Sequence, residues 1–199
     1  LNTHFSETQL LEAIVKDFGL KPKNNSRISL IWELNKFLLR ESEAGYNIVL
    51  IVDEAQNLKP ALLEQIRLLS NLETEKDKLL QVILVGQPEL NDKLNLYDLR
   101  QLRQRIMVRY HIAPLEFDEI KTYINHRLNV AGAVDNRIQF KVDTIELISK
   151  FSSGTPRLIN MLCDRALLAG FVAETNIIDS SIIKKCIEEF DHYLVGECG

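Results

Sequence analysis

The chain has 199 residues, of which 46% are apolar and 26% are charged, as in an ordinary globular protein with a sizeable core. The formal net charge of −4 argues against wholesale nucleic-acid binding, while a local basic patch stays compatible with it. Three widely spaced cysteines without a CxxC pair, four scattered histidines and the lack of a long apolar run argue against a disulfide framework, a zinc site and a membrane span.

The first half of the chain alternates helical and strand patterns. Ser6 with Gln9 has the pattern of a capping box that opens a helix ending at Gly19, and Ser26 precedes a second helical pattern that runs to about Gly45. Residues 48–52 then form a continuous apolar run of strand length. A short run of this kind indicates a strand covered on both faces, as in a parallel sheet.

Helix and strand patterns continue to alternate up to residue 114. Pro60 suits the first turn of a helix, and "LLQVILVG" at 79–86 predicts a second buried strand. Two short helical patterns and a third predicted strand, "IMVRYHI" at 106–112, follow. The fold predicted for residues 1–114 is therefore an α/β core, a parallel sheet of the P-loop NTPase type with crossover helices.

After Pro114 the helical patterns dominate. They cover roughly residues 116–130, 143–152, 156–171 and 180–190, and only "IQFK" at 138–141 has the character of a short extended piece. We therefore expect residues 115–199 to form a small all-helical domain.

Two adjacent carboxylates, Asp53 and Glu54, follow directly on the first predicted strand. The carboxyl ends of parallel strands form the functional edge of an open sheet. There, one carboxylate can hold Mg²⁺ through its water shell, and the other can polarise a water that attacks a γ-phosphoryl group. The plain alternative is that Asp53 caps a turn and Glu54 is merely exposed.

The second predicted strand ends in "VGQP", which places Gln87 beside Asp53 if the two strands are neighbours. Gln87 can then sense the γ-phosphate or orient the attacking water. The alternative is an ordinary turn residue before Pro88.

Arginines concentrate between residues 100 and 109. They could form a nucleic-acid patch, a solvated helix face with ion pairs, or a group presented to a nucleotide on a neighbouring subunit. The position in the chain favours Arg103 or Arg105 for the third role.

Arg157 lies in the first turn of a predicted helix, after Gly154, Thr155 and Pro156. The helix dipole disfavours a cation at this end, so another group should attract Arg157, and a phosphate is a good candidate. A nearby carboxylate such as Asp164 or Asp191 is the alternative partner.

In this order, the four pieces resemble an AAA+ ATPase from its Walker B strand to its sensor 2 helix. "IVLIVDEAQNL" resembles Walker B, "VILVGQPEL" the sensor 1 strand, "LRQLRQRI" followed by "PL" the arginine-finger segment, and "GTPRLINMLCDRAL" sensor 2. The phrases "DEAQNL", "IRLLSNLET", "VGQPEL" and "LRQLRQRI" are similar to the ExeA-like general secretion pathway protein A branch. The resemblance covers nearly the whole chain.

The resemblance implies a role for each candidate residue in an enzyme that uses Mg²⁺ and ATP. Asp53 would serve magnesium, Glu54 would be the general base and Gln87 would act as sensor 1. Arg105, with Arg103 as the fallback, would be the finger acting on a neighbouring subunit, and Arg157 would be sensor 2.

The resemblance also implies a cellular setting. Members couple ATP hydrolysis to the assembly of secretion or pilus machinery of the envelope, at the cytoplasmic face of the inner membrane, and a homo-oligomer is expected. Nucleic acid is not an expected partner, and contact with the membrane is expected only through segments outside this chain.

The sequence departs from the family in one respect that matters. A P-loop, GxxxxGK[ST], supplies the amides and the lysine that hold phosphates, and none of the eight glycines here precedes a Lys-Ser or Lys-Thr pair. Because the chain starts with Leu, we expect it to be cut just downstream of the P-loop. The 199 residues alone are then expected to bind ATP poorly and to hydrolyse little of it.

Three other readings stay open. "DEAQ" resembles a helicase box, but no Ser-Ala-Thr-like motif follows it. A transposition-type AAA+ regulator that binds DNA would share the same core, with salt-dependent DNA affinity as the discriminator. A degenerate ATPase fold could also act as a non-catalytic interaction module.

Overall fold

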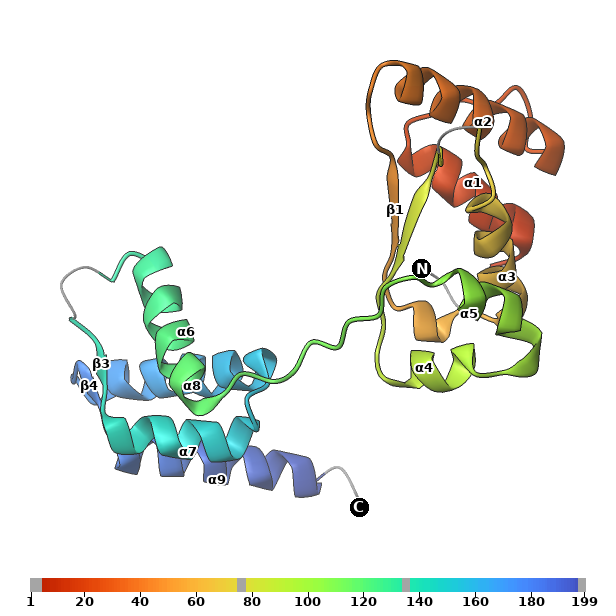
Figure 1. The fold of residues 1–199 in the computed structure, drawn as a ribbon. Coiled ribbons are helices and arrows are strands. Elements are labelled where there is room, and N and C mark those ends of the chain that lie inside the picture. Colours follow the sequence, from red (N-terminus) through yellow and green to blue (C-terminus); the bar gives the residue numbers. More distant parts are fainter. Residues whose placement is uncertain (1–4, 75–77, 134–136, 197–199) are drawn as a thin grey trace. The chain divides into compact units, whose positions relative to one another are not determined.

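A computed structural model describes residues 5–74, 78–133 and 137–196, with only the backbone described for 191–196. The chain divides after Arg109 into two compact units. This division falls five residues before the boundary predicted after residue 114. The reading of the two units as an ATPase core and its lid stays a prediction, and each unit is described by itself (Figure 1).

The first unit contains short helices around two strands. Its elements are α1 (Glu7–Asp17), α2 (Arg27–Glu43), β1 (Val49–Val52), η1 (Ala55–Asn57), α3 (Pro60–Leu69), β2 (Gln81–Leu84), α4 (Glu89–Leu94), η2 (Tyr97–Leu99) and α5 (Arg100–Arg105). The predicted caps are confirmed. The Ser6 side chain accepts a hydrogen bond from the Gln9 backbone N–H, and the Gln9 side-chain oxygen accepts one from the Ser6 backbone N–H. The Ser26 side chain accepts from the Ser29 N–H at the start of α2.

The strands β1 and β2 are parallel neighbours, with α3 on the connection between them (Figure 1). The register pairs Val49 with Gln81 and Val52 with Leu84. Val52 belongs to the same buried core as Leu63 and Ile66 of α3. The predicted strand–helix–strand arrangement with a parallel sheet is therefore confirmed, and it aligns the carboxyl ends of both strands.

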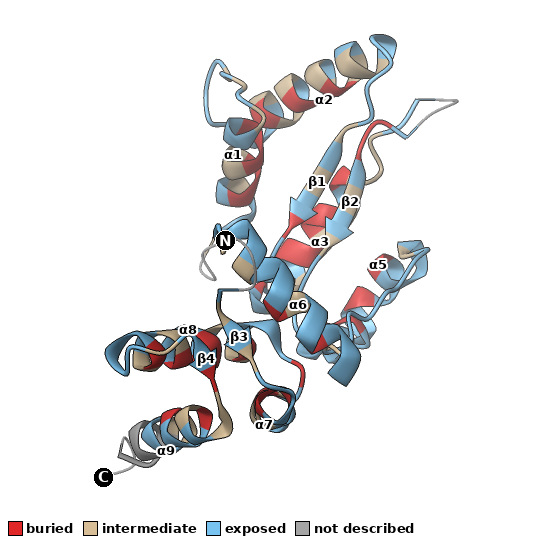
Figure 2. Ribbon diagram, turned by 90° about the vertical axis from the view of Figure 1, so that its left-hand side faces the viewer, coloured by how far each residue is buried: buried red, intermediate tan, exposed pale blue. Residues whose placement is uncertain are grey.

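The expectation that the first strand is covered on both faces is wrong for the described residues. In Figure 2, α3 lies behind β1 and β2, and the two strands are drawn largely in the colours of exposed and intermediate residues. Four aliphatic side chains remain exposed there, namely Val49 (39%), Ile51 (62%), Ile83 (48%) and Val85 (42%). An apolar pattern indicates that a face of a strand favours burial, but it does not identify the segment that covers this face.

The predicted third strand at 106–112 is also absent from the described structure. α5 ends at Arg105, and residues 106–116 belong to neither helix nor strand. Met107, Val108, Tyr110 and Ile112 are each more than four-fifths exposed. Since a strand needs a hydrogen-bonded neighbour, apolar β-branched residues alone do not make one.

The second unit packs four helices around its own core. Its elements are α6 (Phe117–Val130), β3 (Gln139–Phe140), α7 (Val142–Ser152), α8 (Pro156–Val172), β4 (Ile177–Ile178) and α9 (Ser180–Gly196). The four predicted helices are confirmed. "All-helical" needs one correction, because β3 and β4 form a short parallel pair in which the extended "IQFK" piece takes part. Among the described helices of the chain, none is long and apolar enough to cross a membrane.

Candidate active site

The ends of β1 and β2 meet at one edge of the sheet. Val85 donates its backbone N–H to Val52 O, and Ala55 donates to Val85 O, both at 2.9 Å. These two bonds extend the ladder past the strands and hold the Asp53–Glu54 turn beside the loop that contains Gly86 and Gln87. The sequence prediction that the two polar strand ends are neighbours is therefore correct in its backbone geometry.

Asp53 lies exposed at this edge and uses one carboxylate oxygen locally. Its Oδ1 accepts the Glu54 backbone N–H at 2.8 Å, which fixes the side chain against the turn. Oδ2 accepts no hydrogen bond from the residues that the structure describes. A single exposed carboxylate with a free oxygen has the donor chemistry that a hydrated Mg²⁺ takes from a protein.

Glu54 has a backbone conformation that is rare for a residue with a side chain. Its φ of 56° and ψ of 35° lie in the left-handed region, which costs about 1–3 kcal/mol for a non-glycine residue. Its carboxylate is held by two amides, because Gln56 Nε2 and Asn57 Nδ2 donate to Oε2 at 2.8 and 3.1 Å. Both bonds go to the same oxygen, so Oε1 is left to accept from another donor.

Gln87 takes part through its backbone. Its N–H donates to Gln56 Oε1 at 3.2 Å, while its exposed side chain forms no recorded bond within the described residues. Sequence reasoning missed Gln56, which joins the two strand ends. The only available signal was its place two residues after Glu54, and that spacing acquires meaning only from the left-handed turn.

Lys93 of α4 anchors the same turn from below. Its ammonium donates to the carbonyl oxygens of Gln56 and Leu58, the second at 2.9 Å. Both bonds are charge-assisted, which makes them stronger than neutral ones. The turn after β1 is therefore attached to the segment after β2 by its backbone, by Gln56 and by Lys93.

The two finger candidates differ in their surroundings. Both lie exposed in α5, where Arg103 Nη1 donates to Asn95 Oδ1 at 3.3 Å. Arg105, the last residue of α5, has no recorded partner among the described residues. Arg105 is accordingly the one whose guanidinium is available for a group outside this unit.

Arg157 belongs to the second unit. Thr155 is the N-cap of α8 without a side-chain cap bond, Pro156 is N1, and Arg157 is exposed in the first turn. Within the described residues its guanidinium has no ion-pair partner; the side chain of Asp191, one expected alternative, lies outside them. Gly154, with φ 77°, packs closely on Leu115, which donates its N–H to Gly154 O at 2.9 Å.

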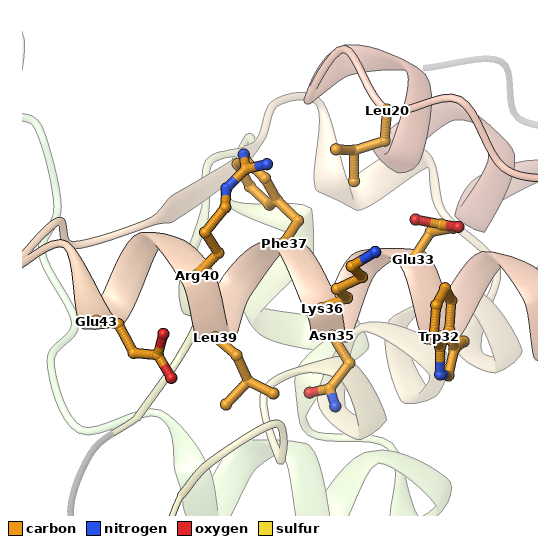
Figure 3. A pocket seen from close by; sticks show the side chains of 9 residues that line it. All are labelled: Leu20, Trp32, Glu33, Asn35, Lys36, Phe37, Leu39, Arg40 and Glu43. Carbon is orange, nitrogen blue, oxygen red and sulfur yellow. The ribbon is translucent and has the colours of Figure 1, made fainter.

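One pocket of the first unit lies away from the strand ends. Its volume is about 580 Å³, and Leu20 and residues of α2 line it (Figure 3). Lys36 Nζ stands 5.2 Å from the Trp32 ring centre there. Neither Asp53, Glu54 nor Gln87 lines this cavity. In the described part of the chain, no three His, Cys, Asp or Glu side chains gather as a metal-binding cluster.

Comparisons with known proteins place this geometry in a family. A family profile described as an AAA domain matches residues 1–94. General secretion pathway protein A of Aeromonas hydrophila is 46% identical over 172 residues, which cover 86% of this chain. The chain is an AAA-domain protein related to general secretion pathway protein A. It spans only 31% of the length of that relative.

Solved structures agree with this AAA assignment at the level of the fold. The ADP form of the Aeropyrum pernix ORC2 protein has a TM-score of 0.64 at 15% identity, covering 92% of this chain and 50% of that one. Cdc6p of Pyrobaculum aerophilum has a TM-score of 0.62 at 20% identity, covering 92% and 49%. The RuvB branch migration motor of Thermotoga maritima has 0.56 at 17%, covering 92% and 57%. The predicted P-loop NTPase-type fold is thereby confirmed.

The site of this AAA-domain chain fits the cofactors of the family in part. Asp53 offers the exposed carboxylate oxygen that Mg²⁺ requires. For the phosphates of ATP, the 199 residues contain no GxxxxGK[ST] sequence, so that backbone cradle is not supplied by them. The 199 residues therefore offer a carboxylate for the metal and no P-loop sequence for the phosphates.

Proposed function

We propose that this chain provides the catalytic edge and the sensor 2 helix of a Mg²⁺-dependent ATPase. The single observation that carries the proposal is the arrangement at the ends of two parallel strands. Asp53 and Glu54 leave β1 beside the Gly86–Gln87 loop of β2, and the Glu54 carboxylate is oriented through one oxygen only. An aligned carboxylate with a free oxygen is what a general base for water attack requires.

Each site residue receives a role under this proposal. Asp53 binds the hydrated metal, Glu54 accepts the proton of the attacking water through Oε1, and Gln87 contacts the terminal phosphate or that water. Mg²⁺ and ATP supply the phosphoryl group and neutralise its charge when bound. The free guanidinium of Arg105, with Arg103 as the fallback, acts on the nucleotide of a neighbouring subunit, and Arg157 contacts phosphate from the helical unit.

The cellular role belongs to the same proposal. The relative from Aeromonas hydrophila is named general secretion pathway protein A, and it is 46% identical to this chain over 86% of the chain. We therefore place the ATPase in a homo-oligomer that drives assembly of secretion or pilus components of the envelope. Its place is the cytoplasmic face of the inner membrane.

Titration of a fluorescent ATP analogue with Mg²⁺ tests the nucleotide role. The titration is made with these 199 residues and with the natural protein extended upstream through any P-loop it has. We expect the longer protein to bind and turn over ATP and the 199 residues to bind it at least ~10-fold more weakly. In the longer protein, Glu54→Gln should bind ATP but hydrolyse it ~10²–10⁴-fold more slowly.

A matched control is Glu43→Gln, the same loss of charge at an exposed position of α2. It should leave both binding and turnover unchanged. If the longer protein neither binds nor hydrolyses ATP, the interaction-module reading replaces the enzymatic one. DNA binding that weakens steeply with salt would instead favour the transposition-type regulator.

A further inference from the structure

The side chain of Gln56 occupies the space between the two strand ends. Its Oε1 accepts the Gln87 backbone N–H at 3.2 Å, and its Nε2 donates to Glu54 Oε2 at 2.8 Å. It is half-buried, and its own carbonyl is fixed by Lys93. One amide group thus contacts both the loop after β2 and the carboxylate after β1.

The chemistry of the two partners fixes how this amide is oriented. A backbone N–H can only donate, and an ionised carboxylate can only accept. Turning the amide over would place Nε2 against the Gln87 N–H and Oε1 against the Glu54 carboxylate, two repulsive contacts. The arrangement therefore requires a group with an acceptor at one end and a donor at the other, which a glutamine supplies.

Gly86 makes the bridge tight from the β2 side. A Cβ at position 86 would stand 2.7 Å from Gln56 Oε1 and 3.3 Å from the Gln56 backbone nitrogen. The absence of a side chain at Gly86 thus allows the loop to approach the amide closely. Of the atoms around such a Cβ, Gln56 Oε1 is the nearest.

We propose that Gln56 is a positioning residue that couples the Gly86–Gln87 loop to the Glu54 carboxylate. A displacement of the loop moves the rigid amide plane, and the amide moves Glu54 Oε2. Asn57 orients the carboxylate, because its side-chain amide donates to Glu54 Oε2 at 3.1 Å. The catalytic consequence of this inference rests on the proposed ATPase function. Under that function, the position of the Gly86–Gln87 loop, which contacts the terminal phosphate, determines how the Glu54 carboxylate is oriented towards the attacking water.

The coupling itself is testable in the 199-residue chain without nucleotide. Gly86→Ala pushes on Gln56 Oε1, and the side-chain amide signals of Asn57 in ¹⁵N NMR report the position of the carboxylate. We expect Gly86→Ala to shift the Asn57 signals when Gln56 is present and to leave them unmoved in a Gln56→Ala background. The backbone at Gly86 is not left-handed, and the one atom under 3.0 Å from the added Cβ is the end of the Gln56 side chain, so that side chain must move to admit the alanine, with Leu90 Cδ2 and Gln56 N next at 3.1 and 3.3 Å.

Gln56→Glu provides a second perturbation that does not involve Gly86. It replaces the donor with a carboxylate facing Glu54, and we expect the Asn57 signals to shift. Gln101→Glu, the same change at an exposed position of α5 without a recorded side-chain partner, should leave them in place. If the chemical shifts of the Asn57 side-chain amide change in neither Gly86→Ala nor Gln56→Glu, the proposal is overturned.

The consequence for catalysis is measured in the full natural protein as Mg²⁺-ATP turnover. Since small misplacements of a catalytic group cost up to ~10²-fold, Gln56→Ala should lower kcat by ~10–100-fold while ATP affinity stays within about 3-fold. Asn125→Ala, which removes an exposed side-chain amide from α6, should change neither. Unchanged kcat in Gln56→Ala refutes the positioning role, whereas a wild-type protein without turnover refutes the ATPase function and leaves the NMR result to decide the coupling.

Discussion

The two units of the chain treat their apolar surfaces differently. In the helical unit, α6, α7, α8 and α9 bury one face each in a shared core, and Ile178 of the short strand pair is 1% exposed. In the first unit, the inward face of the sheet is buried on α3, while the outward face leaves Ile51 and Ile83 about half or more exposed. Both units have a core; the four-residue strands of the first leave an aliphatic sheet face without a described cover, while the two-residue pair of the second leaves Ile177 48% exposed.

This difference shows where local sequence is sufficient. A helix pair can bury its apolar stripe against the next helix in the chain, so neighbouring segments complete the helical unit. A parallel strand has two faces and two edges, and each needs a partner from another part of a polypeptide. The functional edge sits on this second kind of element, because the carboxyl ends of parallel strands gather polar residues from distant segments.

The largest effect is expected at Gly154, which closes the helical unit. An alanine there keeps a strained φ of 77°, and its Cβ would overlap Leu115 O and stand 2.9 Å from Leu115 N. Strain and overlap together should lower the free energy of unfolding by about 4 kcal/mol. Urea unfolding followed by far-UV circular dichroism measures this.

Gly132→Ala is the matched control for that change. Gly132 has φ 88°, also in the left-handed region, but no atom of the described residues lies within 4 Å of its added Cβ. It should lose only the strain, about 1–2 kcal/mol. Equal losses at both positions would mean that the close packing of Gly154 on Leu115 contributes nothing.

The same substitution on the two sides of the sheet should give the next largest effect. Ile66 of α3 is 1% exposed under the covered face, and Ile66→Ala should cost about 3 kcal/mol. Ile51 is 62% exposed on the open face, so Ile51→Ala should cost less than about 1 kcal/mol. The fluorescence of Trp32, the only tryptophan, follows unfolding of this unit. A cost at Ile51 close to that at Ile66 would show that the open face is covered in solution.

The sequence predicted those features that depend on local pattern. The Ser6–Gln9 capping box, the two parallel strands and the neighbouring carboxyl ends of these strands all follow from residue type and spacing. The role of Gln56 could not be predicted, because it depends on the left-handed backbone of Glu54 and on how closely Gly86 approaches. The predictions of a third strand and of a cover on both faces of the sheet were wrong for a related reason. An apolar pattern indicates that residues favour burial, but it does not identify the segment against which they are buried.

The stability of the helical unit should depend on pH through a buried thiol in its core. Burial, with a smaller contribution from the Asp164 carboxylate, raises the pKa of the Cys163 thiol from its ordinary 9.0 to about 12. The folded state therefore holds this proton more tightly than the unfolded state. The stability that it contributes is fully present below pH 9 and is lost as the pH rises towards 12.

Unfolding at pH 8 and pH 10.5 measures this contribution. Between these values the wild-type protein should lose about 2 kcal/mol more than Cys163→Ala, in which the thiol is absent. Comparing the two proteins cancels the groups they share, including Cys186, whose pKa is also raised by burial. Parallel pH dependences would mean that the thiol ionises in the folded protein as readily as in the unfolded one.

The smallest effect is expected for the open sheet face itself, as weak self-association of the chain. The four exposed aliphatic residues on β1, β2 and directly after β2 form a continuous patch, and such patches favour contact with another surface.

Sedimentation velocity at rising protein concentration should show an increase in mass, and the double substitution Ile51→Thr with Ile83→Thr should reduce this increase. Ile28→Thr removes an exposed isoleucine from α2, 83% exposed and outside the sheet, and should not reduce it. If all three proteins associate alike, exposed apolar area of any kind is responsible; if none does, the open face needs a specific partner surface, and a second copy of this chain does not provide it.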